Sequence, residues 1–297
     1  MKSIRDLKGC GTALVTPFKR DGSLDEEALQ KLVAFQIREG IDFLVPCGTT
    51  GESVTLRQEE HLRVVELVVQ ASRKSKTPVI AGAGGYHTEH VIEMARKVAK
   101  TGADGILSVT PYYNKPTQEG LYQHFKAIAE EVDLPLILYN VPGRTVADLA
   151  NDTTLRLAQV PGIVGIKDAT GNLERGIDLI KRAPAGFAIY SGDDATGCEF
   201  MLRGGDGVIS VTNNVAPRLM AQMCAAALGG DRCAAMGVNA MLGPLHHELF
   251  VQSNPIPVKW AVFELGLASR GIRLPLTWLT EELQPRVRQA MRHAGIN

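Results

Sequence analysis

The chain lacks the features that point to nucleic acid or membrane. Lysine plus arginine and aspartate plus glutamate number 32 each in 297 residues, so no surplus of positive charge exists to neutralise a nucleic-acid backbone or an anionic membrane. No run of about 18 apolar residues occurs, and the segment from Met1 to Lys8 lacks the apolar core of a signal peptide. We therefore expect a cytoplasmic protein whose partner is a small molecule.

Cysteine is also scarce. The five cysteines are Cys10, Cys47, Cys198, Cys224 and Cys233. An odd number without a Cys-X-X-Cys pair suits neither a disulfide framework nor a zinc site, so we expect reduced residues in the core.

The histidines predict no metal site. His87 and His90 have a spacing that can bind a metal, but they stand at the start of a predicted helix, where a solvated terminus is the commoner situation. His246 and His247 are consecutive, and on a helix they would point in different directions.

The chain does contain short apolar runs that alternate with longer amphipathic stretches. Strands are predicted at 11–16, 43–47, 78–82, 105–109, 135–140, 163–167, 188–191 and 207–211. A helix is predicted at 25–40, where Leu29, Leu32 and Val33 follow a 3.6-residue period together with Gln36. Ser23 with Glu26 forms a capping box that would begin this helix.

Eight strand–helix units predict an α/β fold, the (β/α)8 TIM barrel. A doubly wound open sheet alternates in the same way, but it usually has a glycine-rich turn after its first strand, where this chain has Thr-Pro-Phe at 16–18. Beyond residue 229 only helices are predicted, at 232–250, 255–267 and 280–294. The chain is therefore divided into a catalytic barrel at 1–229 and a small C-terminal helical region at 230–297.

Three of the predicted strands end in or next to side chains that can bind a ligand or react. In a TIM barrel the reacting groups come from the carboxyl ends of the strands and the loops after them. After the second strand, the segment 48–53 offers backbone N–H groups and the hydroxyls of Thr49 and Thr50, which can hold a carboxylate. A plain tight turn explains this segment equally well by itself.

The fifth predicted strand ends at Tyr139, and the loop after it contains Arg144. A tyrosine there can move protons, and an arginine can bind a carboxylate through two hydrogen bonds. Without further context, a rim tyrosine beside a surface arginine is the commoner situation.

Lys167 ends the sixth apolar run. If its side chain points into the barrel, desolvation lowers the pKa of the amine and produces the nucleophile that imine formation needs. A lysine at a strand end is more often a surface residue. After the seventh strand, where phosphosugar barrels often bind phosphate, this chain has the acidic residues Asp193 and Asp194. Two negative charges disfavour phosphate binding, so we expect an unphosphorylated substrate.

Six blocks of the sequence support a more specific interpretation. They are GTTGES (48–53), TPYYNKPTQEG (110–120), YNVPGRT (139–145), GIKDATG (165–171), SGDD (191–194) and SNPIPVKW (253–260). Together they resemble the dihydrodipicolinate synthase family of class I pyruvate aldolases, over Gly9 to Met291. The resemblance implies a homotetramer, arranged as a dimer of dimers, that condenses pyruvate with L-aspartate-4-semialdehyde in the diaminopimelate and lysine pathway. It implies no cofactor and no metal.

The resemblance also implies the roles of individual residues. Lys167 would form the imine with pyruvate, and Tyr139 would be the central acid and base. Thr50 would belong to a proton relay with Tyr139, together with Tyr113 from a neighbouring subunit.

The substrate-binding residues follow from the same resemblance. Thr49 and Thr50 would hold the carboxylate of pyruvate, and Ile209 would line the site through its main chain. Arg144 would bind the carboxylate of the semialdehyde.

Two other functions remain open at this point. A sister aldolase, such as N-acetylneuraminate lyase or a 2-keto-3-deoxy-sugar-acid aldolase, shares the barrel, the lysine and the tyrosine. Arg144 with Thr50 favours a second substrate that carries a carboxylate. A non-catalytic pyruvate-binding barrel would be favoured if the relay were broken, but every member of the relay is present.

The resemblance further bears on feedback inhibition by lysine. Ser53, His61 and Tyr112 match the lysine-sensitive members of the family. Tyr86 stands where those members have asparagine, and His90 where they have the glutamate that receives the ammonium group of the ligand. An imidazole cannot replace that carboxylate, so we expect weak or absent inhibition. The alternative, that these positions only face solvent, predicts the same insensitivity.

Overall fold

The structure, a computed structural model, describes residues 7–296. At its centre eight parallel strands follow the order β2-β1-β8-β7-β6-β5-β4-β3. They are β1 (Gly9–Ala13), β2 (Phe43–Val45), β3 (Ile80–Gly82), β4 (Gly105–Val109), β5 (Leu136–Asn140), β6 (Ile163–Asp168), β7 (Ala188–Ser191) and β8 (Gly207–Ser210). A parallel bridge between Leu44 and Val79 joins β2 to β3. This bridge closes the predicted TIM barrel.

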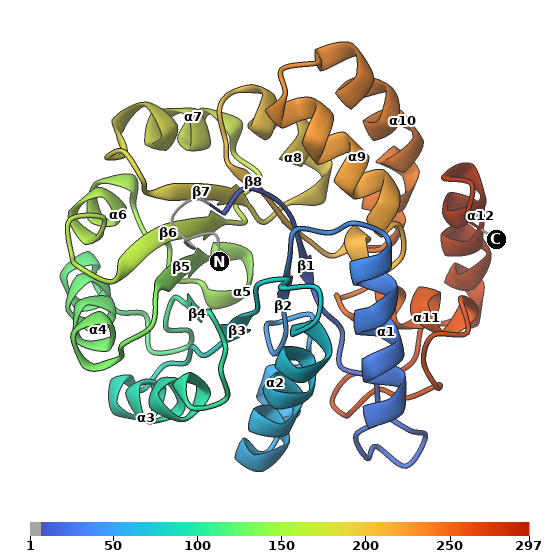
Figure 1. Ribbon diagram of the computed structural model, residues 1–297, viewed down its shortest axis with the longest axis horizontal. Helices are drawn as coiled ribbons and strands as arrows, with labels where there is room; N and C mark the ends of the chain where they lie inside the picture. Colours follow the sequence, from blue (N-terminus) through green and yellow to red (C-terminus); the bar gives the residue numbers. More distant parts are fainter. Residues whose placement is uncertain (1–6, 297) are drawn as a thin grey trace.

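The helices form a ring around the strands (Figure 1). The ring contains α1 (Glu26–Arg38), α2 (Gln58–Ser72), α3 (Thr88–Ala99), α4 (Gln118–Glu131), α6 (Asn151–Leu157), α7 (Leu173–Arg182), α8 (Asp194–Leu202) and α9 (Pro217–Leu228). The one-turn helix α5 (Pro142–Thr145) follows β5 and lies near the centre of the ring (Figure 1). Short 3-10 turns lie at η2 (Ser53–Thr55) and η3 (Thr212–Asn214).

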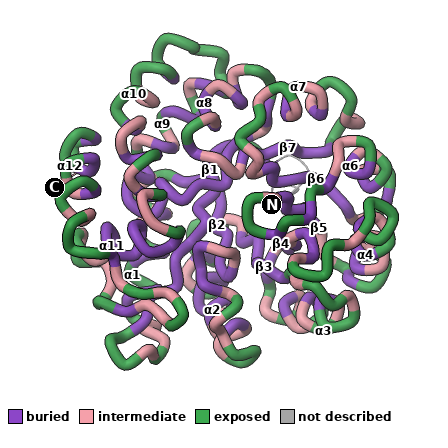
Figure 2. Tube along the Cα trace, turned by 180° about the vertical axis from the view of Figure 1, so that it is seen from behind, coloured by how far each residue is buried: buried purple, intermediate pink, exposed green. Residues whose placement is uncertain are grey.

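The strands are buried on both faces, as parallel strands in α/β proteins generally are. Ile137 and Tyr139 of β5 pack inside the barrel, whereas Leu136 and Leu138 pack in the outer cluster against the helices. Figure 2 shows this buried centre and the exposed outer sides of the helices. The active-site side chains are therefore carried on a rigid, closely packed frame.

Two local predictions near the N-terminus were wrong. The first strand runs from Gly9 to Ala13 and not over 11–16, because it begins where Gly9 pairs with Gly207 of β8. The first helix is capped by Asp25, whose Oδ1 accepts a hydrogen bond of 3.1 Å from the N–H of Ala28. Ser23 instead donates its hydroxyl to Asp21 in the preceding turn, so the predicted Ser23–Glu26 capping box does not form.

Three helices follow the barrel: α10 (Arg232–Glu248), α11 (Ile256–Glu264) and α12 (Gln284–His293). The helix predicted at 280–294 begins with a 3-10 turn, η4 (Glu281–Leu283), before α12. Figure 1 places α11 and α12 on the side of the barrel that carries α1. The hydroxyl of Ser269 donates to Asp25 at 3.1 Å and ties this region to the start of α1. The division into parts at 229 and 230 stays a prediction.

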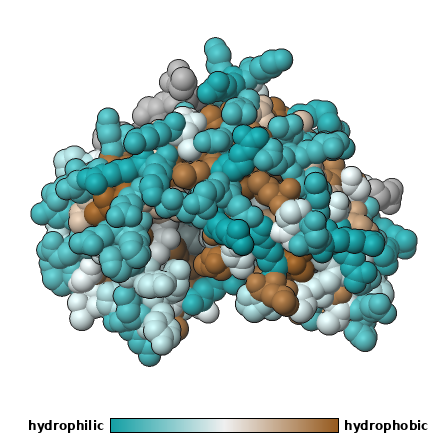
Figure 3. Space-filling model, turned by 90° about the horizontal axis from the view of Figure 1, so that it is seen from below, coloured by the Kyte–Doolittle hydropathy of each residue, from teal (hydrophilic) through white to brown (hydrophobic). Residues whose placement is uncertain are grey.

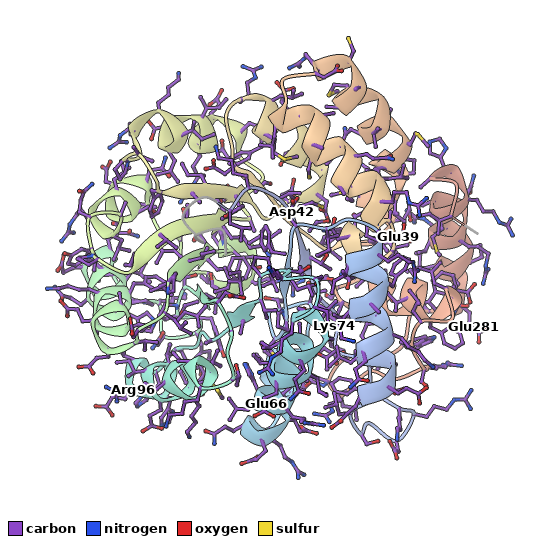
Figure 4. The ribbon with its side chains drawn as sticks, viewed as in Figure 1. Glu39, Asp42, Glu66, Lys74, Arg96 and Glu281 are labelled. Atoms are coloured by element: carbon purple, nitrogen blue, oxygen red, sulfur yellow. The ribbon has the colours of Figure 1, made fainter. Side chains whose placement is uncertain are left out.

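Four cysteines are buried, as predicted, but Cys233 is exposed. The prediction of a core residue was wrong for Cys233 because it lies on the solvent side of α10. The face of the molecule seen in Figure 3 is mainly hydrophilic with scattered hydrophobic patches. Arg96 and Glu281 lie at the outer edge of the molecule in Figure 4. Within residues 7–296, no helix has both the length and the apolar character needed to cross a membrane.

Candidate active site

A cavity of about 240 Å³ lies at the carboxyl ends of the strands. Its lining includes Gly48, Thr49 and Ser53 after β2, Tyr139 and Val141 at the end of β5, and Arg144 and Thr145 of α5. Two of the three predicted strand ends therefore contribute directly to one cavity.

Lys167, at the third predicted strand end, is buried beside this cavity. It is paired with Tyr139 of β5 on one side and with Tyr190 of β7 on the other. Both tyrosines belong to the cluster inside the barrel, and residues paired across parallel strands share a face, so Lys167 points inward. Its Nζ lies 4.4 Å from the centre of the Tyr139 ring. The amine is thus buried in the barrel interior, as a nucleophilic lysine in a hydrophobic pocket is.

An irregularity between β5 and β6 produces this orientation. Val164 belongs to the inner cluster, so strict alternation would place Ile166 inside the barrel and Lys167 outside. The register shifts between Leu136 and Ile137. Ile166 consequently packs in the outer cluster and Lys167 faces the interior. Re-aiming a side chain beside an active site is a common role of such irregularities.

Space for the lysine side chain comes from Gly192, directly after β7. A Cβ atom at residue 192 would lie 2.8 Å from Cε of Lys167 and 2.7 Å from Cβ of Ala169. Any side chain here would therefore displace the amine. The hydrogen bonds of the neighbouring acids go to other partners in the described chain. Asp193 caps α8, and the buried Asp194 accepts a 3.0 Å bond from the N–H of Val211 after β8.

The segment 48–53 forms a compact turn. The N–H of Glu52 donates to the carbonyl of Thr49 at 3.1 Å. Thr16 donates its hydroxyl to the carbonyl of Gly51 at 2.7 Å and holds the turn against the end of β1. Thr50 is buried and Thr49 is half-buried beside the cavity. This geometry leaves the Thr49 side of the turn open to a ligand.

Asn254 joins two of the predicted binding elements. Its Nδ2 donates to Oγ1 of Thr50 at 2.9 Å, and its carbonyl accepts a 3.2 Å bond from Nη2 of Arg144. Because the Thr50 oxygen accepts this bond, the hydroxyl proton of Thr50 stays available for another acceptor. Arg144 itself is exposed at the mouth of the cavity.

The remaining predicted residues lie at different depths. Ile209 is buried in the inner cluster on β8. Tyr113 is 90% exposed and has a φ of 74°, in the loop after β4. In the described chain no hydrogen bond links Thr50, Tyr139 and Tyr113. One chain thus brings Lys167, Tyr139, Thr50 and Arg144 together but leaves Tyr113 outside.

Sequence reasoning assigned no role to three residues that surround this site. Asn254 and Lys259 belong to the SNPIPVKW block, and Gly192 belongs to the SGDD block. Their membership of these blocks was the feature of the sequence that could have pointed to these residues. What they contact lies too far away in sequence to be inferred from spacing.

A second cavity of about 250 Å³ lies beside the first and shares Ser53 and Tyr112 with it. His61, Tyr86 and His90 also line it. Burial lowers the pKa of His61, while its Nε2 lies 2.8 Å from the carbonyl of Gly82. The positions compared with lysine-sensitive relatives therefore surround a cavity and do not only face solvent.

The histidine pairs occupy the positions predicted for them. The Nδ1 atom of His87 accepts a 3.3 Å bond from the N–H of His90 and caps α3, and the two rings stack with centres 4.1 Å apart. His246 is buried against Thr212, whereas His247 is exposed. Among residues 7–296 no group of three or more His, Cys, Asp or Glu side chains is placed to hold a metal ion.

A lysine beside a tyrosine inside the carboxyl end of a TIM barrel suits the chemistry of a class I, Schiff-base lyase. The model of the dihydrodipicolinate synthetase family matches residues 6–294. The chain belongs to this family.

Two relatives are similar in sequence to this chain along nearly its whole length. A 4-hydroxy-tetrahydrodipicolinate synthase from Methylococcus capsulatus is 58% identical over 98% of this chain and 99% of its own length. One from Thiobacillus denitrificans is 57% identical over 100% of both chains.

Solved structures agree as well. The chloride-inhibited dihydrodipicolinate synthase from Acinetobacter baumannii, complexed with pyruvate, has a TM-score of 0.96 and 52% identity over 98% of this chain and 100% of its own. DHDPS from Cyanidioschyzon merolae with lysine bound has a TM-score of 0.95 and 41% identity, covering 98% of this chain and 99% of its own.

Proposed function

We propose that Lys167 forms an imine with pyruvate and that Tyr139 transfers the protons of the reaction. The overall activity is the 4-hydroxy-tetrahydrodipicolinate synthase reaction, the condensation of pyruvate with L-aspartate-4-semialdehyde. The observation that carries the assignment of residues is the pairing of Lys167 with Tyr139, with Nζ 4.4 Å from the ring centre.

The chemistry follows from a buried amine. Lys167 attacks the ketone carbon of pyruvate, and water leaves as the imine forms. Loss of a methyl proton gives an enamine, whose carbon attacks the aldehyde of the second substrate. The amine of that substrate then displaces Lys167 and closes the ring. Each step moves a proton, and in this proposal the Tyr139 hydroxyl donates or accepts it.

The other residues bind the two carboxylates in this proposal. Thr49 and Thr50 hold the carboxylate of pyruvate, and the main chain at Ile209 lines the same site. Arg144 binds the carboxylate of the semialdehyde. Its exposed position at the mouth of the cavity supports this role, because the semialdehyde enters after pyruvate has bound.

We further propose a homotetramer arranged as a dimer of dimers, in which Tyr113 of one subunit completes the relay of its neighbour. An exposed tyrosine with a positive φ supports this role, because a bulky residue in that conformation needs a compensating contact. A cytoplasmic location stays a proposal, to be tested by cell fractionation. The mechanism requires no cofactor.

Trapping tests the proposed nucleophile. Pyruvate with borohydride should fix a covalent adduct on Lys167, identified by peptide mapping. An adduct on another lysine, or none, would refute the assignment.

The acceptor is tested separately. With pyruvate and a panel of aldehydes, we expect aspartate semialdehyde to be consumed with pyruvate, and N-acetylmannosamine and glyceraldehyde to be left. Consumption of a sugar aldehyde instead would indicate a sister aldolase.

A further inference from the structure

A buried ion pair lies directly behind the turn that borders the active-site cavity. Nζ of Lys259 on α11 donates to Oε1 of Glu52, and their side chains are only 3% and 1% exposed. The two residues are separated by 207 positions in the sequence. A buried pair of this kind gives little net stability compared with apolar residues, so a role in fixing geometry is the better explanation of its presence.

The backbone of Glu52 is in an unfavourable conformation. Its φ of 53° and ψ of 36° lie in the left-handed region, which costs a side-chain-bearing residue on the order of 1 kcal/mol. In that conformation Glu52 donates its N–H to Thr49, while its side chain points back to α11. The side-chain contacts therefore hold a turn that the backbone alone disfavours.

The surroundings of the pair restrict it further. Oε2 of Glu52 accepts a 3.1 Å bond from the N–H of Arg273. The ammonium of Lys259 and the guanidinium of Arg273 lie 4.2 and 4.1 Å from the ring centre of Phe18. Both carboxylate oxygens of Glu52 thus have partners, which restrain its side chain.

The same C-terminal segment reaches the other side of the turn. Asn254, just before α11, donates to Thr50. Thr50 and Glu52 flank Gly51, where a Cβ atom would lie 3.0 Å from both the N of Cys47 and the carbonyl oxygen of Leu14. The segment at 254–273 therefore holds the turn at two points. The backbone of Cys47 and Leu14 leaves little space for a side chain at Gly51 between them.

We propose that the Glu52–Lys259 ion pair is a positioning device that holds Thr49 and Thr50 in the orientation that binds the carboxylate of pyruvate. This inference rests on the proposed function of these threonines. Neither Glu52 nor Lys259 is among the described residues that line the active-site cavity, so both act through the turn. Their loss should weaken pyruvate binding more than it slows the chemistry at Lys167.

The test variant must avoid an unpaired buried charge. Lys259→Met alone would leave Glu52 without a partner and could unfold the protein. Glu52→Gln with Lys259→Met removes both charges at nearly constant volume. Glu52→Gln alone is the second variant: burial already lowers the pKa of Lys259 to about 8, so the amine can lose its proton when the carboxylate is gone. Glu264→Gln is the matched control, because Glu264 is on the same helix and pairs with Arg288 away from the cavity.

The readout is borohydride trapping on Lys167 as a function of pyruvate concentration, combined with steady-state kinetics. In the double variant we expect the pyruvate concentration for half-maximal trapping, and KM for pyruvate, to rise about tenfold, with kcat changed less than about threefold. Glu52→Gln should give a smaller rise and Glu264→Gln none.

Two outcomes separate the inference from the proposed function. If folded variants, verified by thermal unfolding, keep the half-saturation of the wild type or lose only kcat, the ion pair does not position the turn. If the wild type itself forms no adduct on Lys167, the proposed function fails first.

Discussion

Lys167 and Tyr139 face each other across β6 and β5, with the amine 4.4 Å from the centre of the aromatic ring. Tyr139 also lines the cavity at the carboxyl ends of the strands. In the proposed mechanism Tyr139 therefore contacts the nucleophile with its ring and transfers protons with its hydroxyl. The two roles can be separated by experiment.

Tyr139→Phe keeps the ring and removes the hydroxyl. We expect kcat to fall by about 10²- to 10³-fold, because a positioned acid and base contributes that much, while trapping of pyruvate on Lys167 at saturation is kept. Steady-state kinetics and mass spectrometry of the adduct measure both. A variant with wild-type kcat would remove Tyr139 from the proton transfers.

Tyr113→Phe tests the shared site. It should lower kcat far more than it raises KM for pyruvate, since the proposal gives Tyr113 proton transfer and no substrate contact. Analytical ultracentrifugation with activity measured over a dilution series is the companion experiment. Full activity in a dilute monomer of the wild type would contradict the shared relay.

Lysine should inhibit weakly or not at all. Ser53, His61 and Tyr112 line a cavity that is also lined by Tyr86 and His90. The resemblance to lysine-sensitive family members implies a carboxylate at the position of His90 and a smaller asparagine at that of Tyr86. Loss of the charge partner should weaken lysine binding about a hundredfold or more. Inhibition curves measure this, with the double variant His90→Glu and Tyr86→Asn as the gain-of-function test. Strong inhibition of the wild type below about 1 mM, in the micromolar-to-millimolar range of ordinary ligand affinities, would show that the cavity has been misassigned.

The Glu60 carboxylate should stabilise the folded protein at neutral pH but not in acid. The side-chain hydrogen bonds from Arg273 lower its pKa from 4.5 to about 2. The folded state therefore holds the proton less tightly than the unfolded state. The contribution is complete above pH 4.5 and is lost as the pH falls toward 2.

Glu60→Gln should accordingly lower the free energy of unfolding by about 2 kcal/mol at neutral pH. This is less than the full pKa shift would give, because the Glu60–Arg273 pair is partly exposed and solvent screens it. The difference from the wild type should shrink below pH 4.5. Denaturant unfolding at pH 7, 5 and 3.5 measures the trend, with exposed Glu59→Gln as the control. A difference that does not depend on pH would mean that Glu60 acts through packing only.

The sequence by itself determined the barrel and the family. Apolar runs closed by turn residues were enough to predict the strands, because hydrophobic periodicity and turn chemistry are local properties. The blocks around Thr49, Tyr139 and Lys167 were enough to identify the family, and the comparisons confirmed it.

The tertiary structure alone decided which way Lys167 points. The run Ile163–Lys167 is apolar on both faces up to the lysine, so it contains no alternation from which an inside could be read. The register shift opposite β5 turns the amine into the barrel. The contact of Lys259 with Glu52 was likewise beyond sequence reasoning, because packing of α11 against the barrel brings together charges 207 positions apart.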